Sequence, residues 1–391
     1  MGAGVFSLPW AVAQGGLLFV PAFILAAAAL ALYTLSILVD AKRAVLKARP
    51  DRALQARSRP LRARRGASPP PQLSSYTGIV EESLGGTFGR LAEMMNLACC
   101  FGICSAYLVF VASTLATVFH AAGGQNTMVW AITPAMVGLA WLRSMAGVSV
   151  MAVVGNASVL LGMAVVGWFS LQQGWRVAQL PLANPGGFGS YFGSVAFLFF
   201  IHFTLPAIES AMAQPQRFMT ATRKGFALCA LVGCAFGALG AAAFGPSVSS
   251  VVITQLGATK LATAVKLLLC VNLLFTFPIV CRSAFLIIEG FFERTGAQLS
   301  TLQQRALRTA FVVLASTLAT SVPSFGALLN LVGGVSLSLI SLVFPPLILL
   351  LAKDAQGRAL LPRSGLERAW AALIAAAGLA IMVYTLLTGM R

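Results

Sequence analysis

The stretch His202-Phe-Thr-Leu-Pro206 interrupts an apolar segment that covers residues 190–213. Proline has no backbone N–H and cannot continue a helix ladder, so this stretch predicts a broken helix. A second interruption stands near the start, where Gly2-Ala-Gly-Val-Phe-Ser-Leu-Pro9 leads into a half-helix that ends at Gly15-Gly16. At membrane depth, unwound backbone is tolerated only where it is buried in protein or lines a cavity. In a bilayer, the two interruptions would therefore mark an internal site.

The composition places the chain in a bilayer. Of its 391 residues, 58% are hydrophobic and 9% are charged, whereas about 25% are charged in soluble proteins. A transmembrane helix needs about 20 apolar residues, so about ten spans would occupy half of the chain. This composition excludes a soluble enzyme, a nucleic-acid-binding protein and a disordered protein. It predicts an all-α polytopic membrane protein with one transmembrane domain over residues 1–391.

The apolar pattern predicts eleven transmembrane segments, the first truncated because the chain begins inside it. After that first segment, the predicted spans cover residues 17–39, 91–119, 128–142, 146–171, 190–213, 225–244, 261–292, 306–322, 325–352 and 371–387. The two interrupted segments lie five spans apart, and each opens a block of five helices. Interrupted segments at corresponding positions of two halves predict a 5+5 inverted repeat. The first repeat would cover residues 1–171 and the second residues 190–352, with residues 371–387 as a peripheral eleventh helix.

The basic residues indicate the orientation of the chain. Ten of the 27 lysines and arginines fall between Lys42 and Arg65, within a proline-rich loop at residues 40–75. Cytoplasmic loops carry an excess of basic residues. Placing this loop in the cytoplasm puts 23 basic residues inside and 4 outside. The net charge of +17 therefore indicates topology rather than nucleic-acid binding. The predicted location is the plasma membrane or a vacuolar or other endomembrane.

The interruptions also suggest what the site binds. Free N–H groups at a half-helix N-terminus attract a carboxylate, and free carbonyls attract an ammonium group or a cation. Together they match an α-amino acid zwitterion. Glycine and proline are also common in membrane helices, so it is the matched position of the two interruptions that favours a transporter.

Several motifs resemble the amino acid/auxin permease family. They are spread over nearly the whole chain and comprise Gly2 to Gly16, the Tyr76 to Arg90 segment, Gly193-Ser-Val-Ala-Phe with Leu205-Pro206 and Glu209, Thr276-Phe-Pro278 with Arg282, and Pro323 to Gly334 followed by Pro345. The resemblance implies a leucine-transporter-type fold of eleven helices. It also implies proton- or sodium-coupled amino acid transport.

The resemblance further implies functional residues. The substrate carboxylate would meet the backbone amides of the first interruption, at Gly2, Ala3, Gly4 and Val5. The substrate amine or side chain would meet the second, at His202, Phe203 and Thr204. Thr276 matches a threonine that ligates sodium in sodium-coupled members.

Ionisable groups in the predicted spans are candidates for carrying a coupling proton, since such groups are costly in a bilayer and often functional. Glu209 and His202 are the candidates, and the alternative for each is a structural polar contact. Arg282 and Glu289 are predicted to pair with neighbours near an inner gate. Asp40 and Glu93 are predicted as solvated span ends.

The cysteines and phenylalanines indicate which cofactors and substrates to expect. The seven cysteines lie in apolar stretches without metal-ligand spacing, which predicts buried free thiols and no metal or cofactor beyond the coupling ion. Phe203 and its neighbouring phenylalanines predict an apolar pocket for a neutral side chain. The predicted function is neutral amino acid symport with a proton, or alternatively sodium, and its partners are the amino acid and membrane lipids. An amino-acid-binding sensor without flux and an inactive fragment are the alternatives, and no catalytic motif indicates an enzyme.

Overall fold

The fold is described from a computed structural model, in which residues 2–48, 73, 75–120, 122–141, 148–297, 299–322, 324–354 and 356–388 are placed. Within these residues all the regular elements are helical. They are η1 (Ala3–Ser7), α1 (Leu8–Gly15), α2 (Phe19–Ala48), α4 (Tyr76–Leu84), α5 (Gly86–Val118), α6 (Gly124–Ala140), α7 (Val148–Gln172), η2 (Val177–Gln179), η3 (Pro185–Gly187), α8 (Phe188–Phe199), α9 (Leu205–Ala211), η4 (Pro215–Arg217), α10 (Phe218–Phe244), η5 (Gly245–Ser247), η6 (Val252–Gln255), α11 (Lys260–Arg294), α12 (Thr301–Ser321), α13 (Phe325–Val332), η7 (Gly333–Leu337), η8 (Leu339–Val343), α14 (Phe344–Leu351) and α15 (Gly365–Thr388).

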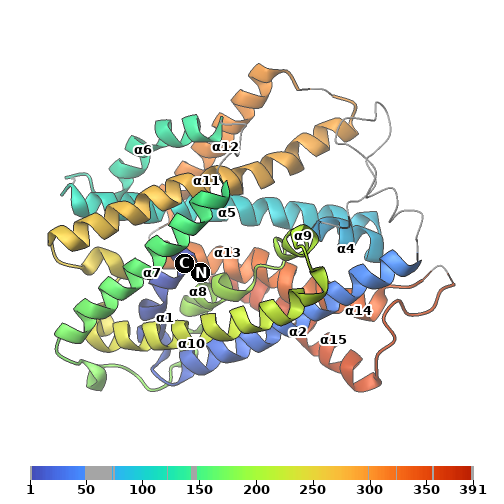
Figure 1. Cartoon of the computed structure of the whole chain (residues 1–391), viewed down its shortest axis with the longest axis horizontal. Helices are drawn as coiled ribbons and strands as arrows, with labels where there is room; N and C mark the ends of the chain where they lie inside the picture. The colour runs from blue at the N-terminus through green and yellow to red at the C-terminus, as the bar shows by residue number, and fades with distance from the viewer. Residues whose placement is uncertain are drawn as a thin grey trace.

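The helices form two groups (Figure 1). Helices α1, α2, α8 and α10 pack together and are called the bundle here; α5, α6, α11 and α12 pack together and are called the scaffold. Helix α7 contacts α10 of the bundle and α11 of the scaffold, and α13 contacts α8 and α5. The core lies where the groups meet: Phe6, Phe110 and Phe325 are at most 2% exposed, and the Phe110 ring contacts both of the others.

Seven helical segments within the described residues are long and apolar enough to cross a bilayer. They are Phe19–Lys47, Gly86–Val118, Val153–Gln172, Pro215–Ser247, Lys260–Arg294, Phe325–Leu351 and Gly365–Thr388. The other predicted spans coincide with helices that are interrupted (η1–α1 and α8–α9), short (α6) or partly polar (α12). The count of eleven spans therefore stays a prediction, while the all-helical membrane fold is confirmed.

Helix α2 runs beyond the predicted end of its span. The sequence places a loop from residue 40, but α2 continues to Ala48, while residues 49–72 and 74 of that loop lie outside the described residues. Alanine, leucine, lysine and arginine, which dominate the added turns, are good helix formers. The extension carries Asp40, Lys42 and Arg43, whose contacts are described below.

The tenth predicted span is not one regular α-helix. Between α13 and α14, Gly333–Leu337 and Leu339–Val343 adopt π-helical geometry. Two physical causes coincide here: glycines weaken the helix at one end, and Pro345 and Pro346 remove N–H donors at the other. The wide turns lie against α8, because a Cβ at Gly333 would come within 2.6 Å of the Gly193 Cα.

Candidate functional site

The first interruption is a 3₁₀ turn followed by a short helix. Gly2 is extended, Ala3–Ser7 forms η1, and α1 continues from Leu8 to Gly15. The first hydrogen bond of the turn runs from the Val5 N–H to the Gly2 carbonyl, at 3.2 Å. The predicted carboxylate-binding amides therefore differ: the Val5 amide is already bonded, whereas those of Gly2, Ala3 and Gly4 precede the first bond of the turn.

The second interruption falls at the predicted place. Helix α8 ends at Phe199 and α9 begins at Leu205, so residues 200–204 separate two half-helices. The Ile201 N–H bonds the Phe199 carbonyl at 2.9 Å, and the Phe197 carbonyl thereby loses the donor that a continuous helix would supply four residues later. Such a carbonyl at a half-helix C-terminus suits an ammonium group or a cation.

The structure brings the two interruptions together. Both η1 and α1 pack against α8. A Cβ at Gly4 would lie 3.5 Å from the Phe197 Cβ, so the turn of η1 lies directly on the last turn of α8. The start of the first interruption and the end of the half-helix before the second one are thus neighbours.

His202 lies in the second interruption but faces α2. Its ring is fully buried, with Nε2 2.9 Å from the Thr34 hydroxyl and 3.1 Å from the Ala31 carbonyl. Its other nitrogen, Nδ1, is buried and has no hydrogen-bond partner among the described residues. A carbonyl accepts only from a protonated nitrogen, so the Ala31 contact places the proton of the neutral ring on Nε2. Nδ1 is then a buried hydrogen-bond acceptor.

The neighbouring predicted residues have more local roles. The Thr204 hydroxyl donates to the Ile201 carbonyl at 2.9 Å, and Thr204 is also the N-cap position of α9. Phe203 is half-buried and packs against the core. Any contact of these side chains with a substrate stays a prediction.

Glu209 forms a buried ion pair with the extended end of α2. Its carboxylate lies 2.9 Å from the Lys42 Nζ, and the two side chains are 6% and 11% exposed. Lys42 also donates to the Ser210 hydroxyl at 2.8 Å, and Arg43 approaches the carboxylate to 4.0 Å. This arrangement matches the structural alternative for Glu209, and it joins α9 to the bundle.

Thr276 lies in the middle of α11, near Pro278. Its hydroxyl donates to the Asn272 carbonyl at 2.8 Å, one turn back in the same helix. Threonine commonly forms this bond inside helices. A sodium ion at Thr276 stays a prediction.

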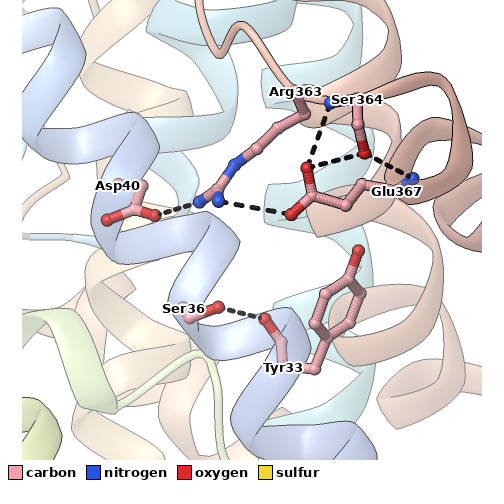
Figure 2. A network of polar contacts seen from close by, with 6 residues as sticks. All are labelled: Tyr33, Ser36, Asp40, Arg363, Ser364 and Glu367. Carbon is pink, nitrogen blue, oxygen red and sulfur yellow. Dashed lines mark hydrogen bonds and ion pairs between the residues drawn. The ribbon is translucent and has the colours of Figure 1, made fainter.

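Sequence reasoning missed a polar network that joins α2 to the start of α15. Figure 2 shows Arg363 between two carboxylates: it donates to Asp40 at 2.6 Å and to Glu367 at 3.4 Å. Glu367 also accepts from the Ser364 N–H at 3.1 Å, and the Ser364 hydroxyl accepts from the Glu367 N–H at 3.3 Å. This reciprocal pair is a capping box at the N-terminus of α15, and its Ser-x-x-Glu spacing was visible in the sequence.

The scaffold carries two further ion pairs. Arg294 donates two hydrogen bonds, of 2.8 and 2.6 Å, to the Glu93 carboxylate, and the Arg308 guanidinium lies 3.0 Å from the Glu289 carboxylate. The prediction that Glu289 pairs with a neighbour is confirmed. The sequence did not predict that arginines from distant parts of the chain pair with Asp40 and Glu93, whose side chains stay 36% and 21% exposed. All of these charges lie on the side that the basic residues predict to be cytoplasmic.

A multi-pass membrane protein with two interrupted helices in contact has the architecture of an inverted-repeat transporter. A family model described as "Transmembrane amino acid transporter protein" matches residues 1–54 and 62–390. The chain belongs to this family, which confirms the resemblance indicated by its motifs.

Curated relatives and a solved structure agree with this assignment. The chain is 27% identical over 300 residues to amino acid transporter AVT3C and 29% identical over 287 residues to amino acid transporter ANT1, both from Arabidopsis thaliana. These matches cover 70% and 66% of this chain, and 66% and 65% of the relatives, just under two thirds of their length. A crystal structure of MhsT in complex with L-phenylalanine matches with a TM-score of 0.61 and 15% identity, over 100% of this chain and 96% of that chain. That likeness confirms the leucine-transporter-type fold.

Proposed function

We propose that the chain is a secondary active transporter of neutral amino acids that works by alternating access with proton coupling. The observation that carries the proposal is the contact between the two interruptions, where η1 lies on the last turn of α8. The amides of Gly2, Ala3 and Gly4 would bind the substrate carboxylate, and the carbonyls at the end of α8 would bind its ammonium group. The named relatives are amino acid transporters, and MhsT holds L-phenylalanine.

The charges around the interruption favour a neutral substrate. Glu209 is the acidic residue nearest in sequence to it, and Lys42 already neutralises that carboxylate at 2.9 Å. A cationic side chain would therefore lack a free counter-charge there. Phe197 beside Gly4 and the half-buried Phe203 supply apolar surface for the substrate side chain.

His202 is the group that we assign to the coupling proton. It lies within the interruption, and its buried Nδ1 has no partner in the part of the chain that the structure describes. Protonation there would add a charge beside the substrate site. Repacking against α2 or a new bond to substrate would then accompany proton binding. Sodium coupling is the rival, with Thr276 as a ligand. We also propose that the chain is oriented with the basic loop after α2 facing the cytoplasm, in the plasma membrane or an endomembrane.

Proteoliposomes containing the purified chain test the proposal. We expect counterflow of a labelled neutral amino acid, and accumulation driven by an imposed pH gradient but not by a sodium gradient. His202→Asn should abolish gradient-driven accumulation while leaving counterflow, since exchange needs no net proton movement. His120→Asn is the matched control, because His120 is the exposed second histidine of the chain.

Each result has a clear meaning. Saturable binding without counterflow would replace transport by the sensor function. Accumulation driven by sodium alone, or undiminished proton-driven accumulation by His202→Asn, would overturn the assignment of the coupling proton.

A further inference from the structure

Arg363 links the bundle to the start of α15. Its guanidinium lies 2.6 Å from the carboxylate of Asp40, which is on α2, and 3.4 Å from the carboxylate of Glu367, which is on α15 (Figure 2). By contrast, the ion pair of Arg294 with Glu93 joins α11 to α5 and stays within the scaffold. A movement of the bundle against the other helices would therefore stretch the contact at Asp40 and leave the scaffold pair intact.

The two carboxylates that meet Arg363 belong to different parts of the fold. Helix α15 packs against α14, and its first turn is held by Ser364, which donates to the Glu367 carboxylate from its N–H at 3.1 Å and from its hydroxyl at 3.2 Å. Glu367 and Arg363 are therefore fixed to the same helix start. Asp40 lies on α2, which packs against α14 along a separate contact, so it would move with the bundle.

The contact between Arg363 and Asp40 can break without leaving a buried charge. The side chains of Arg363, Asp40 and Glu367 are 35%, 36% and 42% exposed. A guanidinium carries five N–H donors, so Arg363 can bond Glu367 alone once Asp40 has moved away, and water can reach the Asp40 carboxylate. Exposed ion pairs of this kind are weak, and the exchange of one partner for the other is correspondingly easy.

We propose that Arg363 is a latch that switches between Asp40 and Glu367 as the bundle moves. In the latched state, Arg363 bonds Asp40 and holds the inner end of α2 against the start of α15. In the released state, Arg363 bonds Glu367 alone, and α2 is free to turn away from α14 and open the cytoplasmic side. This inference rests on the proposed alternating access. Because the pair is exposed, the latch biases the two states by up to about fivefold rather than locking one of them.

Distances between two spin labels, measured by double electron–electron resonance on the full chain in lipid nanodiscs, test the latch. Lys47→Cys places one label at the exposed end of α2, and Leu366→Cys places the other at the start of α15, where the side chain is 82% exposed. Cys229 and Cys234 are replaced by serine beforehand, since the remaining cysteines are buried. We expect a shorter, latched distance and a longer, released distance in the same sample.

Substitution of the two carboxylates should shift these populations in opposite directions. Asp40→Asn should raise the ratio of released to latched molecules by up to about fivefold, because it removes the partner on α2. Glu367→Gln should lower that ratio, because Arg363 then gains less on release, and glutamine preserves the capping box of α15. Glu93→Gln is the matched control: it removes one carboxylate of an arginine pair within the scaffold and should leave the ratio unchanged.

A single distance in the wild type, the same distances in all variants, or shifts in the same direction for Asp40→Asn and Glu367→Gln would overturn the latch. Counterflow of a labelled neutral amino acid, measured on the same variants in proteoliposomes, separates this result from the proposed function. Counterflow with unchanged distances would overturn the latch alone. Distances that follow the two carboxylates in a chain without counterflow would support the latch and count against transport.

Discussion

Replacing Glu209 by glutamine removes one charge of the buried ion pair between α2 and α9 while conserving the size of the side chain. The two side chains are 6% and 11% exposed. Breaking a buried pair from one side costs about 3–5 kcal/mol, because the remaining charge stays buried without compensation. Lys42 keeps its bond to the Ser210 hydroxyl, and the glutamine oxygen can still accept. We therefore expect Glu209→Gln to lower the unfolding free energy by about 2–3 kcal/mol.

A second single variant and a double variant show how much of the lost stability belongs to the interaction between the two side chains rather than to either side chain alone. Lys42→Met alone should cost a similar amount, since it leaves the carboxylate buried. The double variant Lys42→Met/Glu209→Leu should be within about 1 kcal/mol of the wild type, because an apolar pair can replace a buried ion pair without loss. With Glu209→Leu as the single variant that completes the cycle, and a loss of about 2–3 kcal/mol from each single variant, the coupling energy should be about 3–6 kcal/mol.

Unfolding can be followed with a thiol-reactive dye, because Cys99, Cys104 and Cys270 are at most 2% exposed in the folded chain. Additive losses in the double variant would show that the two side chains do not stabilise each other, and single variants that unfold like the wild type would show that the ion pair contributes nothing. The exchanged pair Lys42→Glu/Glu209→Lys adds a functional test. If the pair is structural, the exchange restores both stability and proton-driven uptake; if Glu209 carries the proton, it restores stability alone.

Three further predictions concern the packing and the helix ends. Gly193→Ala should lower the free energy of unfolding by at least about 1–3 kcal/mol, since the added Cβ would collide with the Asn330 backbone. Gly2→Ala is the control, because an added Cβ there has no described atom within 4 Å. Equal melting temperatures of the two variants would contradict the close contact at Gly193. Arg363→Gln should cost no more than about 1 kcal/mol and make stability less sensitive to salt, because its side chain is 35% exposed; a larger loss in melting experiments would show that the network is worth more than a surface ion pair. Ser300→Ala should cost about 1 kcal/mol by removing the capping box of α12, and unchanged urea-dependent unfolding would show that this helix end contributes nothing.

The positions of the interruptions could be predicted from sequence because their causes are local. Pro206 cannot continue a helix from the preceding turn, and the α8–α9 break falls at residues 200–204. The capping box of Ser364 and Glu367 is equally local. Apolar runs likewise located most helices, since length and hydropathy alone decide what crosses a bilayer.

The partners of buried charges could not be predicted because they come from distant parts of the chain. Lys42 was assigned to a loop by its charge, yet it lies on α2 and meets Glu209, which is 167 residues away. The ion pairs of Asp40 and Glu93 could not be predicted because Arg363 and Arg294 lie far from them in the sequence. The direction of the His202 ring is also a tertiary property: sequence placed it at the interruption, but only the packing of α2 shows which nitrogen is left free.

The most direct test of the account is where a bound amino acid lies. A neutral amino acid that carries a diazirine can be cross-linked to the purified chain, and the labelled peptides identified by mass spectrometry. We expect label in the Gly2–Pro9 segment and in residues 197–204, and we expect an excess of unlabelled neutral amino acid to remove it from both. Competable label confined to other helices would contradict a substrate site between the two interruptions.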